Sequence, residues 1–569
     1  VKGRYGSFEF VGHRDRLRTP LVREGDGFRE ASWDEALGIV ARELSGRRGD
    51  VFGGLASAKA TNEDNYVFQR FVRAAMGANN VDHCARLCHA PSVAGLLLSF
   101  GSGAMTNPAD DLPRAETILV TGSNTTEAHP VIGFRVREAV ARGAKLLVFD
   151  PRAIPLTRVA TLWCRQRPGT DVAWINGLMH VILREGLEDR EFIANRTEGF
   201  DEVARMVEGY TPERVEGITS IPAADIVAAA RLYAAAGPAS IVYSMGITQH
   251  TTGVDNTRSL ANLVMLTGNI GKPGAGLNPL RGQNNVQGSC DTGCLPTVFP
   301  GYQPVADEAV RAKFAAAWGT DLSARPGMTV TEMIPAAAAG KIKALYVMGE
   351  NPMVSDADIA HVERGLRALE FLVVQDIFLT ETARLAHVVL PAVSYAERDG
   401  TYTNTERRVQ LTRPVVAPPG QARRDWEIVA EVSTRLGCPM RYDSTREIWD
   451  EMRRLAPAFA GISWARLEAG KSLCWPCPAE DHPGTPTLHV GKFTRGKGAF
   501  AAIEFKPPAE EPDAEFPFVL TTGRILDHFH TRSMTGRSRE MEALEPECFV
   551  ELSAADAARL GLEPGAHVR

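Results

Sequence analysis

The sequence lacks the features that mark several large classes of protein. It has no run of about 18 or more apolar residues, so nothing in it is expected to cross a membrane. It has no basic excess, because 63 Lys and Arg stand against 69 Asp and Glu, and this balance argues against a nucleic-acid-binding protein. Neither a G-x-x-x-x-G-K-[ST] phosphate loop nor a complete G-x-G-x-x-G fingerprint occurs.

Cysteine is sparse and irregularly spaced. The nine cysteines, an odd number, are not typical of a disulfide framework and predict reduced thiols. Cys474 and Cys477 form a lone C-W-P-C, which is either a zinc or redox site or simply two unrelated cysteines. We expect a cytoplasmic protein, and any targeting peptide would precede Val1.

Two well-separated stretches repeat one layout. The first runs through 117–124 and 145–150, and the second through 344–351 and 371–376. Each consists of an apolar strand, a tight Gly/Asn turn, a helix-like stretch and a second strand that ends in a carboxylate. Backbone N–H groups in such a turn can approach a diphosphate, and the acid can bind sugar hydroxyls. The repeat predicts either two dinucleotide-like ligands or two ordinary βαβ units without them.

The wider pattern is that of an α/β protein. Apolar strands alternate with helical patterns over 115–270 and again over 342–395, which is typical of parallel sheets covered on both faces. Ser32–Glu35 has the pattern of a capping box at a helix start, and Ser355–Asp358 predicts a second cap.

The last part of the chain has a different character. Pro-rich segments at 414–419 and 506–517 predict linkers. The segment 516–524 predicts a short strand that opens a separate, mostly β domain.

Cys88 and His89 stand next to each other, just before a helix predicted to begin near Pro91. A thiol near a helix N-terminus and beside an imidazole has its thiolate favoured, and it can act as a nucleophile or a soft metal ligand. An unperturbed imidazole titrates near neutrality, which would suit proton transfer. The alternative is a buried cysteine beside a solvent-facing histidine.

The stretch Arg281–Gly288 reads R-G-Q-N-N-V-Q-G and places one guanidinium and four side-chain amides in eight residues. The amides suit the edge of a heterocycle, and Arg281 could bind a carboxylate through two N–H groups. The alternative is a polar surface loop.

Two phrases together, C-A-R-L-C-H-A-P-S-V-A-G-L and R-G-Q-N-N-V-Q-G-S-C-D-T-G, resemble the molybdenum/tungsten bis-pterin oxidoreductases of the DMSO reductase family, and specifically the formate dehydrogenase catalytic subunits. The phrases N-E-D-N-Y, F-D-P-R, L-T-G-N-I-G-K-P, G-Y-Q-P and R-S-M-T-G agree with this, so the resemblance covers nearly the whole chain. It implies two Rossmann-like, doubly wound parallel-sheet domains related by a pseudo-twofold axis, followed by the start of a C-terminal β-barrel.

The resemblance also implies residue roles. Cys88 would ligate the metal, His89 would be the adjacent catalytic histidine, and Arg281 would hold the formate carboxylate. Lys2 matches a lysine that lies between an iron–sulfur cluster and one pterin. Implied contacts to one dinucleotide are Asn124, Asp150, Arg152, Gly169 and Asp171; those to the other are Asn351, Gln375, Asp376, Asp425, Arg524 and His528; Gln249, Gln283 and Ser355 are further cofactor contacts. A basic residue expected around position 58 is Ala58 here, with Lys59 beside it.

The implied activity is oxidation of formate to CO2 at a molybdenum or tungsten centre held by two molybdopterin guanine dinucleotides. Two electrons would pass to a 4Fe-4S cluster, whose cysteines are expected to precede Lys2 and to lie outside this chain. Electron-transfer subunits, iron–sulfur proteins or flavoproteins that could reduce NAD, are the expected partners. Another bis-pterin enzyme such as a nitrate reductase, or a non-catalytic electron-relay subunit of the same fold, are the alternatives.

The implied domain organisation is discontinuous. The expected segments are 1–12, a remnant of the iron–sulfur domain; 13–83 with 284–395, the second cofactor-binding α/β domain; 84–283, the first such domain; 396–512, a connecting region; and 513–569, the truncated dinucleotide-binding β-barrel.

Overall fold

The computed structural model describes residues 2–235 and 237–568. The chain forms two units, a large one from Asp15 to Arg524 and a small one that combines Val1–Arg14 with Ile525–Arg569. No helix among the described residues combines the length and apolar character needed to cross a membrane.

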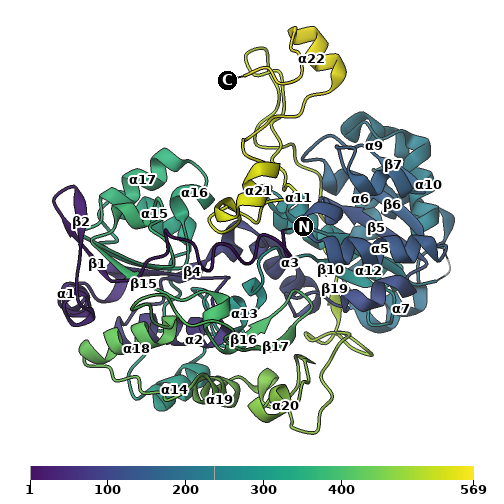
Figure 1. The fold of residues 1–569 in the computed structure, drawn as a ribbon. Helices are drawn as coiled ribbons and strands as arrows, with labels where there is room; N and C mark the ends of the chain where they lie inside the picture. Colours follow the sequence, from purple (N-terminus) through teal and green to yellow (C-terminus); the bar gives the residue numbers. More distant parts are fainter. Residues whose placement is uncertain (1, 236, 569) are drawn as a thin grey trace. The chain divides into compact units, whose positions relative to one another are not determined.

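A seven-stranded sheet forms one half of the large unit (Figure 1), with the order β2-β1-β15-β14-β13-β3-β4. Strands β15, β14, β13, β3 and β4 run parallel, whereas β1 is antiparallel to both β15 and β2. The bounds are β1 Leu21–Glu24, β2 Gly27–Glu30, β3 Phe52–Ala56, β4 Val81–His83, β13 Ala344–Met348, β14 Phe371–Asp376 and β15 Val388–Pro391. The predicted parallel sheet is therefore built from two distant parts of the sequence.

A five-stranded, entirely parallel sheet forms the other half, in the order β10-β9-β5-β6-β7. Its bounds are β5 Thr117–Thr121, β6 Lys145–Phe149, β7 Leu162–Cys164, β9 Ala239–Tyr243 and β10 Gly276–Pro279. Strands β5 and β9 are buried along their whole length, as expected where helices cover both faces.

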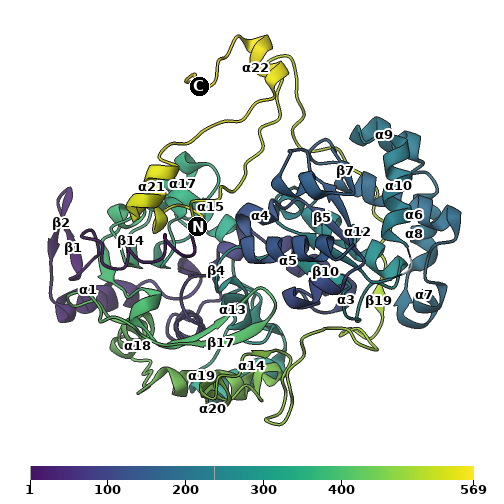
Figure 2. The same ribbon diagram turned by 45° about the vertical axis from the view of Figure 1, so that its right-hand side comes forward.

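Alternate side chains of this sheet enter two different cores. Leu119, Leu147 and Ile241 pack with helices α6 (Asp171–Glu185), α10 (Ala223–Tyr233) and α12 (Gly253–Leu266). On the opposite face, Ile118 and Val120 pack with α5 (Pro130–Ala141). Figures 1 and 2 show α5 and α12 alongside this sheet. The predicted doubly wound α/β architecture is confirmed.

The two predicted helix caps differ in outcome. Ser32 caps α1 (Trp33–Ser45) by accepting a hydrogen bond from the Glu35 N–H at 3.2 Å, while the Glu35 carboxylate binds Arg29. At the second site the cap of α17 (Ile359–Arg367) is Asp358, which accepts from the His361 N–H at 3.1 Å. Ser355 instead ends the short helix α16 (Pro352–Ser355), because helix α17 begins one turn later than the pattern predicted.

The predicted strand at 516–524 is wrong. The last strand among the described residues is β19 (Gly498–Ala499), and the residues from 500 to 568 contain only short helices, among them α21 (Arg539–Leu544) and α22 (Ala554–Leu560). Leu520 is 82% exposed, so its apolar side chain has no sheet face to cover. An apolar alternating segment forms a strand only where another strand pairs with it.

All nine cysteines are free, as predicted.

A buried ionic cluster joins the seven-stranded sheet to its helices. The Arg398 Nη1 lies 2.6 Å from Asp64 Oδ2 and 2.7 Å from Asp425 Oδ2. Asp64 lies on α2 (Asn62–Arg70) and Asp425 begins α18 (Asp425–Arg435), and the Gln375 amide of β14 donates to Asp425 Oδ1 at 2.7 Å. One guanidinium therefore compensates two carboxylates that would otherwise be buried without a counter-charge.

We expect Arg398→Ala to lower the free energy of unfolding by about 3–5 kcal/mol, because it leaves two buried carboxylates without their cation. Equilibrium urea unfolding followed by tryptophan fluorescence measures the effect. Arg413→Ala is the matched control, since Arg413 pairs with Glu468 at the surface, and it should cost about 1 kcal/mol or less. Equal losses in the two variants would contradict the assignment.

Glu63 should make stability depend on pH. Burial raises the pKa of its carboxyl from 4.5 to about 8. The folded state then holds a proton that the unfolded state has released, so stability is greatest below pH 4.5 and falls as pH rises to about 8. Glu63→Gln, which resembles the protonated carboxyl, should raise the melting temperature near pH 8 and leave it unchanged near pH 4. If the melting temperatures of the wild-type protein and Glu63→Gln change with pH in the same way, the expectation is wrong.

Candidate functional site

The predicted site residues of the large unit gather at the carboxyl ends of parallel strands. Asn124 follows β5 and Asp150 follows β6, while Asn351 follows β13 and Asp376 ends β14. In open α/β sheets this edge is where ligands bind, because the strand-to-helix turns present backbone N–H groups there.

Cys88 lies between a 3-10 turn, η3 (Cys84–Leu87), and helix α3 (Ala90–Phe100), which begins where predicted. Hydrogen bonds from two residues that follow strand β9 of the five-stranded sheet hold the backbone at this point. The Thr248 hydroxyl donates to the Cys88 carbonyl at 2.6 Å, and the Gln249 amide donates to the Leu87 carbonyl at 2.6 Å. Gln249, a predicted cofactor contact, therefore positions the turn that presents the thiol. The sequence pattern did not single out Thr248, which comes from a distant helix, α11 (Met245–Thr248).

The Cys88 thiol differs from the expectation that its thiolate is favoured. Burial raises its pKa to about 11, although the charges of Arg281 and Arg524 and the Gly282 N–H act in the opposite direction. Cys88 is only 7% exposed, so loss of hydration outweighs these contributions. Such a thiol becomes a thiolate when it binds a metal cation.

His89 is fully buried and held in one tautomer. Its Nε2 lies 2.9 Å from the Leu280 carbonyl oxygen, which can only accept, so the ring carries its proton there. Its Nδ1 then accepts from the Ser92 hydroxyl at 3.0 Å, and the Tyr243 hydroxyl donates to Ser92 at 2.9 Å. Burial and the charge of Arg281 lower the pKa of His89 to about 3. The expected titration near neutrality is therefore wrong for this environment.

Arg281 is 3% exposed and sits on a tightly held backbone. Its N–H donates to the Thr405 hydroxyl at 3.0 Å, and its carbonyl accepts from His129 Nε2 at 3.0 Å. Its guanidinium donates to the Gly103 carbonyl at 3.3 Å and the Cys290 sulfur at 3.4 Å. Burial disfavours the positive charge and acts to lower the pKa of Arg281. Neighbouring groups, Cys290 and Tyr302 first among them, act in the opposite direction and outweigh burial, so the pKa of Arg281 is raised. Across residues 2–235 and 237–568 no carboxylate forms an ion pair with this guanidinium.

The predicted contacts around the five-stranded sheet lie against neighbouring protein groups. Burial raises the pKa of Asp150 to about 6, and its Oδ1 accepts from the Arg152 N–H at 2.9 Å. Asp171 accepts from the Trp174 indole at 3.2 Å. Gly169 has φ +80°, and the Pro508 ring lies directly over it.

Around the seven-stranded sheet, several predicted contacts are already bound to protein groups. The Asn351 amide donates to Glu381 at 2.8 Å and accepts from the Thr382 hydroxyl at 2.7 Å. Gln375 and Asp425 bind each other in the ionic cluster, and Ser355 donates to the Asn351 carbonyl. The roles of these residues as cofactor contacts remain predictions.

Gln283, Lys2 and His528 are further predicted contacts. Gln283 accepts a hydrogen bond from the Cys84 thiol, four residues before Cys88. In the small unit, the Lys2 ammonium donates to the Ile525 carbonyl at 3.1 Å. There too, His528 Nε2 donates to the Glu545 carbonyl at 2.9 Å. Their contacts with a cofactor remain predictions.

Comparison with known proteins identifies the family. The molybdopterin oxidoreductase model matches residues 16–435, and that of the molydopterin dinucleotide binding domain matches residues 518–569. The chain belongs to the molybdopterin oxidoreductase family. It is 48% identical over 570 residues to the F420-dependent formate dehydrogenase subunit alpha of Methanocaldococcus jannaschii, covering 99% of this chain and 84% of that protein. It is 43% identical to formate dehydrogenase H of Escherichia coli, covering 100% of this chain and 82% of that one.

The fold is also shared with a solved structure. Acetylene hydratase from Pelobacter acetylenicus superposes with a TM-score of 0.79 at 23% identity, covering 98% of this chain and 81% of that one. At this identity the likeness concerns the fold alone.

The site fits the dinucleotide of this molybdopterin family in one testable respect: it holds buried polar atoms that lack partners among the described residues. At the end of β5 and in the turn after it these are Thr121 Oγ1, Asn124 Oδ1 and Thr126 Oγ1, and after β13 it is Glu350 Oε1. A buried acceptor without a donor is costly, whereas a bound ligand rich in amino and hydroxyl groups would satisfy it. Glu350, whose pKa burial raises to about 8, was not predicted, although it follows Gly349 directly in the second turn.

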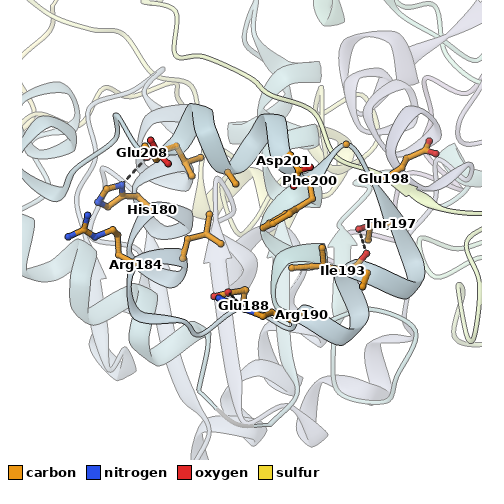
Figure 3. Close-up of a pocket in the computed structure, with 15 residues that line it drawn as sticks. His180, Arg184, Glu188, Arg190, Ile193, Thr197, Glu198, Phe200, Asp201 and Glu208 are labelled. Carbon is orange, nitrogen blue, oxygen red and sulfur yellow. Dashed lines mark hydrogen bonds and ion pairs between the residues drawn. The ribbon is translucent and has the colours of Figure 1, made fainter.

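A pocket of about 700 Å³ lies elsewhere, among α6, α7 (Arg190–Arg196) and α8 (Phe200–Val207) (Figure 3). His180, Arg184, Glu188 and Phe200 line it, and none of the predicted site residues does. This cavity is therefore separate from the predicted site around Cys88.

In cofactor-free protein, we expect iodoacetamide to alkylate Cys88 slowly below pH 11. The Arg524→Gln substitution should slow this reaction further at each pH. Removing a positive charge that stabilises the thiolate raises the pKa of Cys88. Rates of iodoacetamide labelling, resolved at Cys88 by mass spectrometry across alkaline pH, measure the shift. Arg413→Gln, remote and exposed, is the control, and overlapping rate profiles for all three proteins would contradict the electrostatic assignment.

Proposed function

We propose that this chain oxidises formate to CO2 at a molybdenum or tungsten ion that is ligated by Cys88 and held by two molybdopterin guanine dinucleotides. One observation supports this most strongly: the buried guanidinium of Arg281, which forms no ion pair with a carboxylate among the described residues, acts electrostatically on the Cys88 thiol and partly offsets the rise in its pKa that burial causes. The similarity to formate dehydrogenases over nearly the full chain supports the same substrate.

Arg281 suits the recognition of a small carboxylate. Formate offers two oxygens and one C–H bond, so a guanidinium that binds both oxygens determines where the C–H bond points. Each such charge-assisted hydrogen bond contributes about 1.5–3 kcal/mol. Because Arg281 is buried and always protonated, its attraction for the anion is little screened by water.

The reaction removes two electrons and one proton from formate. The metal centre, when bound, supplies the two-electron acceptor. His89 stands next to the ligating residue as a neutral ring, with its Nε2 proton committed to the Leu280 carbonyl. We propose that it serves there as an oriented hydrogen-bonding group, held by Ser92 and Tyr243, within a site that excludes water.

The electrons then leave the chain for electron-transfer partners. We propose a 4Fe-4S cluster as the first acceptor, with Lys2 beside it, and iron–sulfur or flavoprotein subunits beyond it. The remaining cofactor contacts named from the sequence, Arg152, Asp376 and His528 among them, belong to this proposal. The nine free cysteines support a reducing compartment, so we include a cytoplasmic location.

We expect Cys88→Ala to lose both bound metal and formate-dependent dye reduction. Arg281→Ala should keep the metal and lower kcat/KM for formate by roughly 10²- to 10⁴-fold, because about two charge-assisted hydrogen bonds are lost. Arg281→Lys keeps the charge without the planar fork and should fall between wild type and Arg281→Ala. Metal analysis and dye reduction by the loaded protein provide the measurements.

Nitrate serves as the competing substrate in the same assay. Formate oxidation without nitrate turnover separates the proposal from a nitrate reductase, and bound metal separates it from a cofactor-free relay subunit. Wild-type turnover of formate in Cys88→Ala or Arg281→Ala would refute the proposed function.

A further inference from the structure

The sulfur of Cys290 lies against the substrate-binding arginine. Cys290 belongs to helix α13 (Val286–Asp291), which follows the loop of Arg281, and it is fully buried. Its Sγ is 3.4 Å from Arg281 Nη1 and 3.3 Å from His83 Nε2. Neither Cys290 nor His83 has a role in the proposed reaction so far.

The protonation of His83 follows from its other contact. His83 ends strand β4, and its Nδ1 accepts from the Ala85 N–H at 3.4 Å. Burial and the charge of Arg281 lower the pKa of His83 to about 3, so the ring is neutral. A neutral ring that accepts at Nδ1 must carry its proton on Nε2. The N–H of His83 therefore points at the Cys290 sulfur, as an N–H of Arg281 does.

Cys290 thus receives donors from both halves of the large unit. His83 belongs to the seven-stranded sheet, and Arg281 follows β10 of the five-stranded sheet. The second guanidinium contact, from Nη2 to the Gly103 carbonyl, constrains the other arm. Two of the five guanidinium N–H groups are therefore occupied, one on each arm, which limits rotation of the group about its long axis.

We propose that Cys290, held by His83, is a positioning residue that orients the Arg281 guanidinium for binding the carboxylate of formate. This inference rests on the proposed function. Sulfur suits the task because it is a weak acceptor, so it can orient the guanidinium while leaving its positive charge available. An aspartate at the same place would form an ion pair with Arg281 and compete with the substrate.

Variants of the loaded holoenzyme at position 290 test the proposal. Cys290→Ala and Cys290→Ser remove nearly the same volume, but only serine retains an acceptor. We expect Cys290→Ala to raise KM for formate roughly 3- to 15-fold with kcat changed by less than about threefold, because the lost hydrogen bond orients a group that binds formate throughout the reaction. Cys290→Ser should recover most of the wild-type KM.

A second measurement removes turnover from the comparison. The inhibition constant of azide, a triatomic anion that has no C–H bond to oxidise, should rise in parallel with KM in Cys290→Ala. His83→Ala should act in the same direction, and His83→Gln, which keeps a donor, should be closer to wild type. Cys294→Ala is the matched control, since Cys294 is a buried cysteine nearby whose thiol donates to the Asn65 carbonyl.

The outcomes are separable. Equal changes in Cys290→Ala and Cys290→Ser would show a packing effect and overturn the inference, as would a KM within about twofold of wild type in Cys290→Ala. In either case the wild-type enzyme would still oxidise formate, and the proposed function would stand. If the wild-type holoenzyme itself does not oxidise formate, the proposed function is overturned.

Discussion

The proposed site depends on one constraint: a buried guanidinium that has no carboxylate ion-pair partner among the described residues. Taking the charge of Arg281 out of water is costly, and the surrounding protein compensates it only with a carbonyl, a thiol and more distant charges. Burial first, and the same charge second, keep His83 and His89 neutral, and the charge partly offsets the rise that burial causes in the pKa of the Cys88 thiol. An anion that enters this environment meets a cation whose attraction is weakly screened.

A second buried arginine shows the contrast. Arg398 lies between Asp64 and Asp425, so its charge is fully compensated and ties two helices to the seven-stranded sheet. Both side chains are almost completely buried, and both guanidinium groups remain protonated. The difference is in their partners: ion-paired carboxylates make Arg398 part of the scaffold, whereas no carboxylate of the described residues forms an ion pair with Arg281, which suits its proposed role in binding formate.

The two-sheet architecture brings these groups together. Cys88 and His89 precede α3 and are held by residues that follow β9 and β10, while His83 comes from β4 of the other sheet. Hydrogen bonds to the main chain of Cys88 and Arg281 fix the backbone positions from which these two side chains extend. The reactive groups are therefore positioned by several rigid elements rather than by one loop.

Much of the fold follows from local patterns. The repeated strand–turn–helix–strand units, the Ser32 cap and the helix after His89 are all visible in the sequence, because each depends on residues close together in the chain. The association of Cys88 and His89 with Arg281, which are far apart in the chain, came instead from the resemblance to the family. The failures have different causes. Segment 516–524 needs a pairing strand, Ser355 yields to Asp358 as the cap, and the expected thiolate and titratable imidazole yield to burial. Burial, the tautomers of His83 and His89, the Gln375–Asp425 pair and the contact of Cys290 with Arg281 depend on groups that are distant in sequence. Tertiary structure alone decided them, because hydration and hydrogen-bond partners are determined only when those distant segments pack.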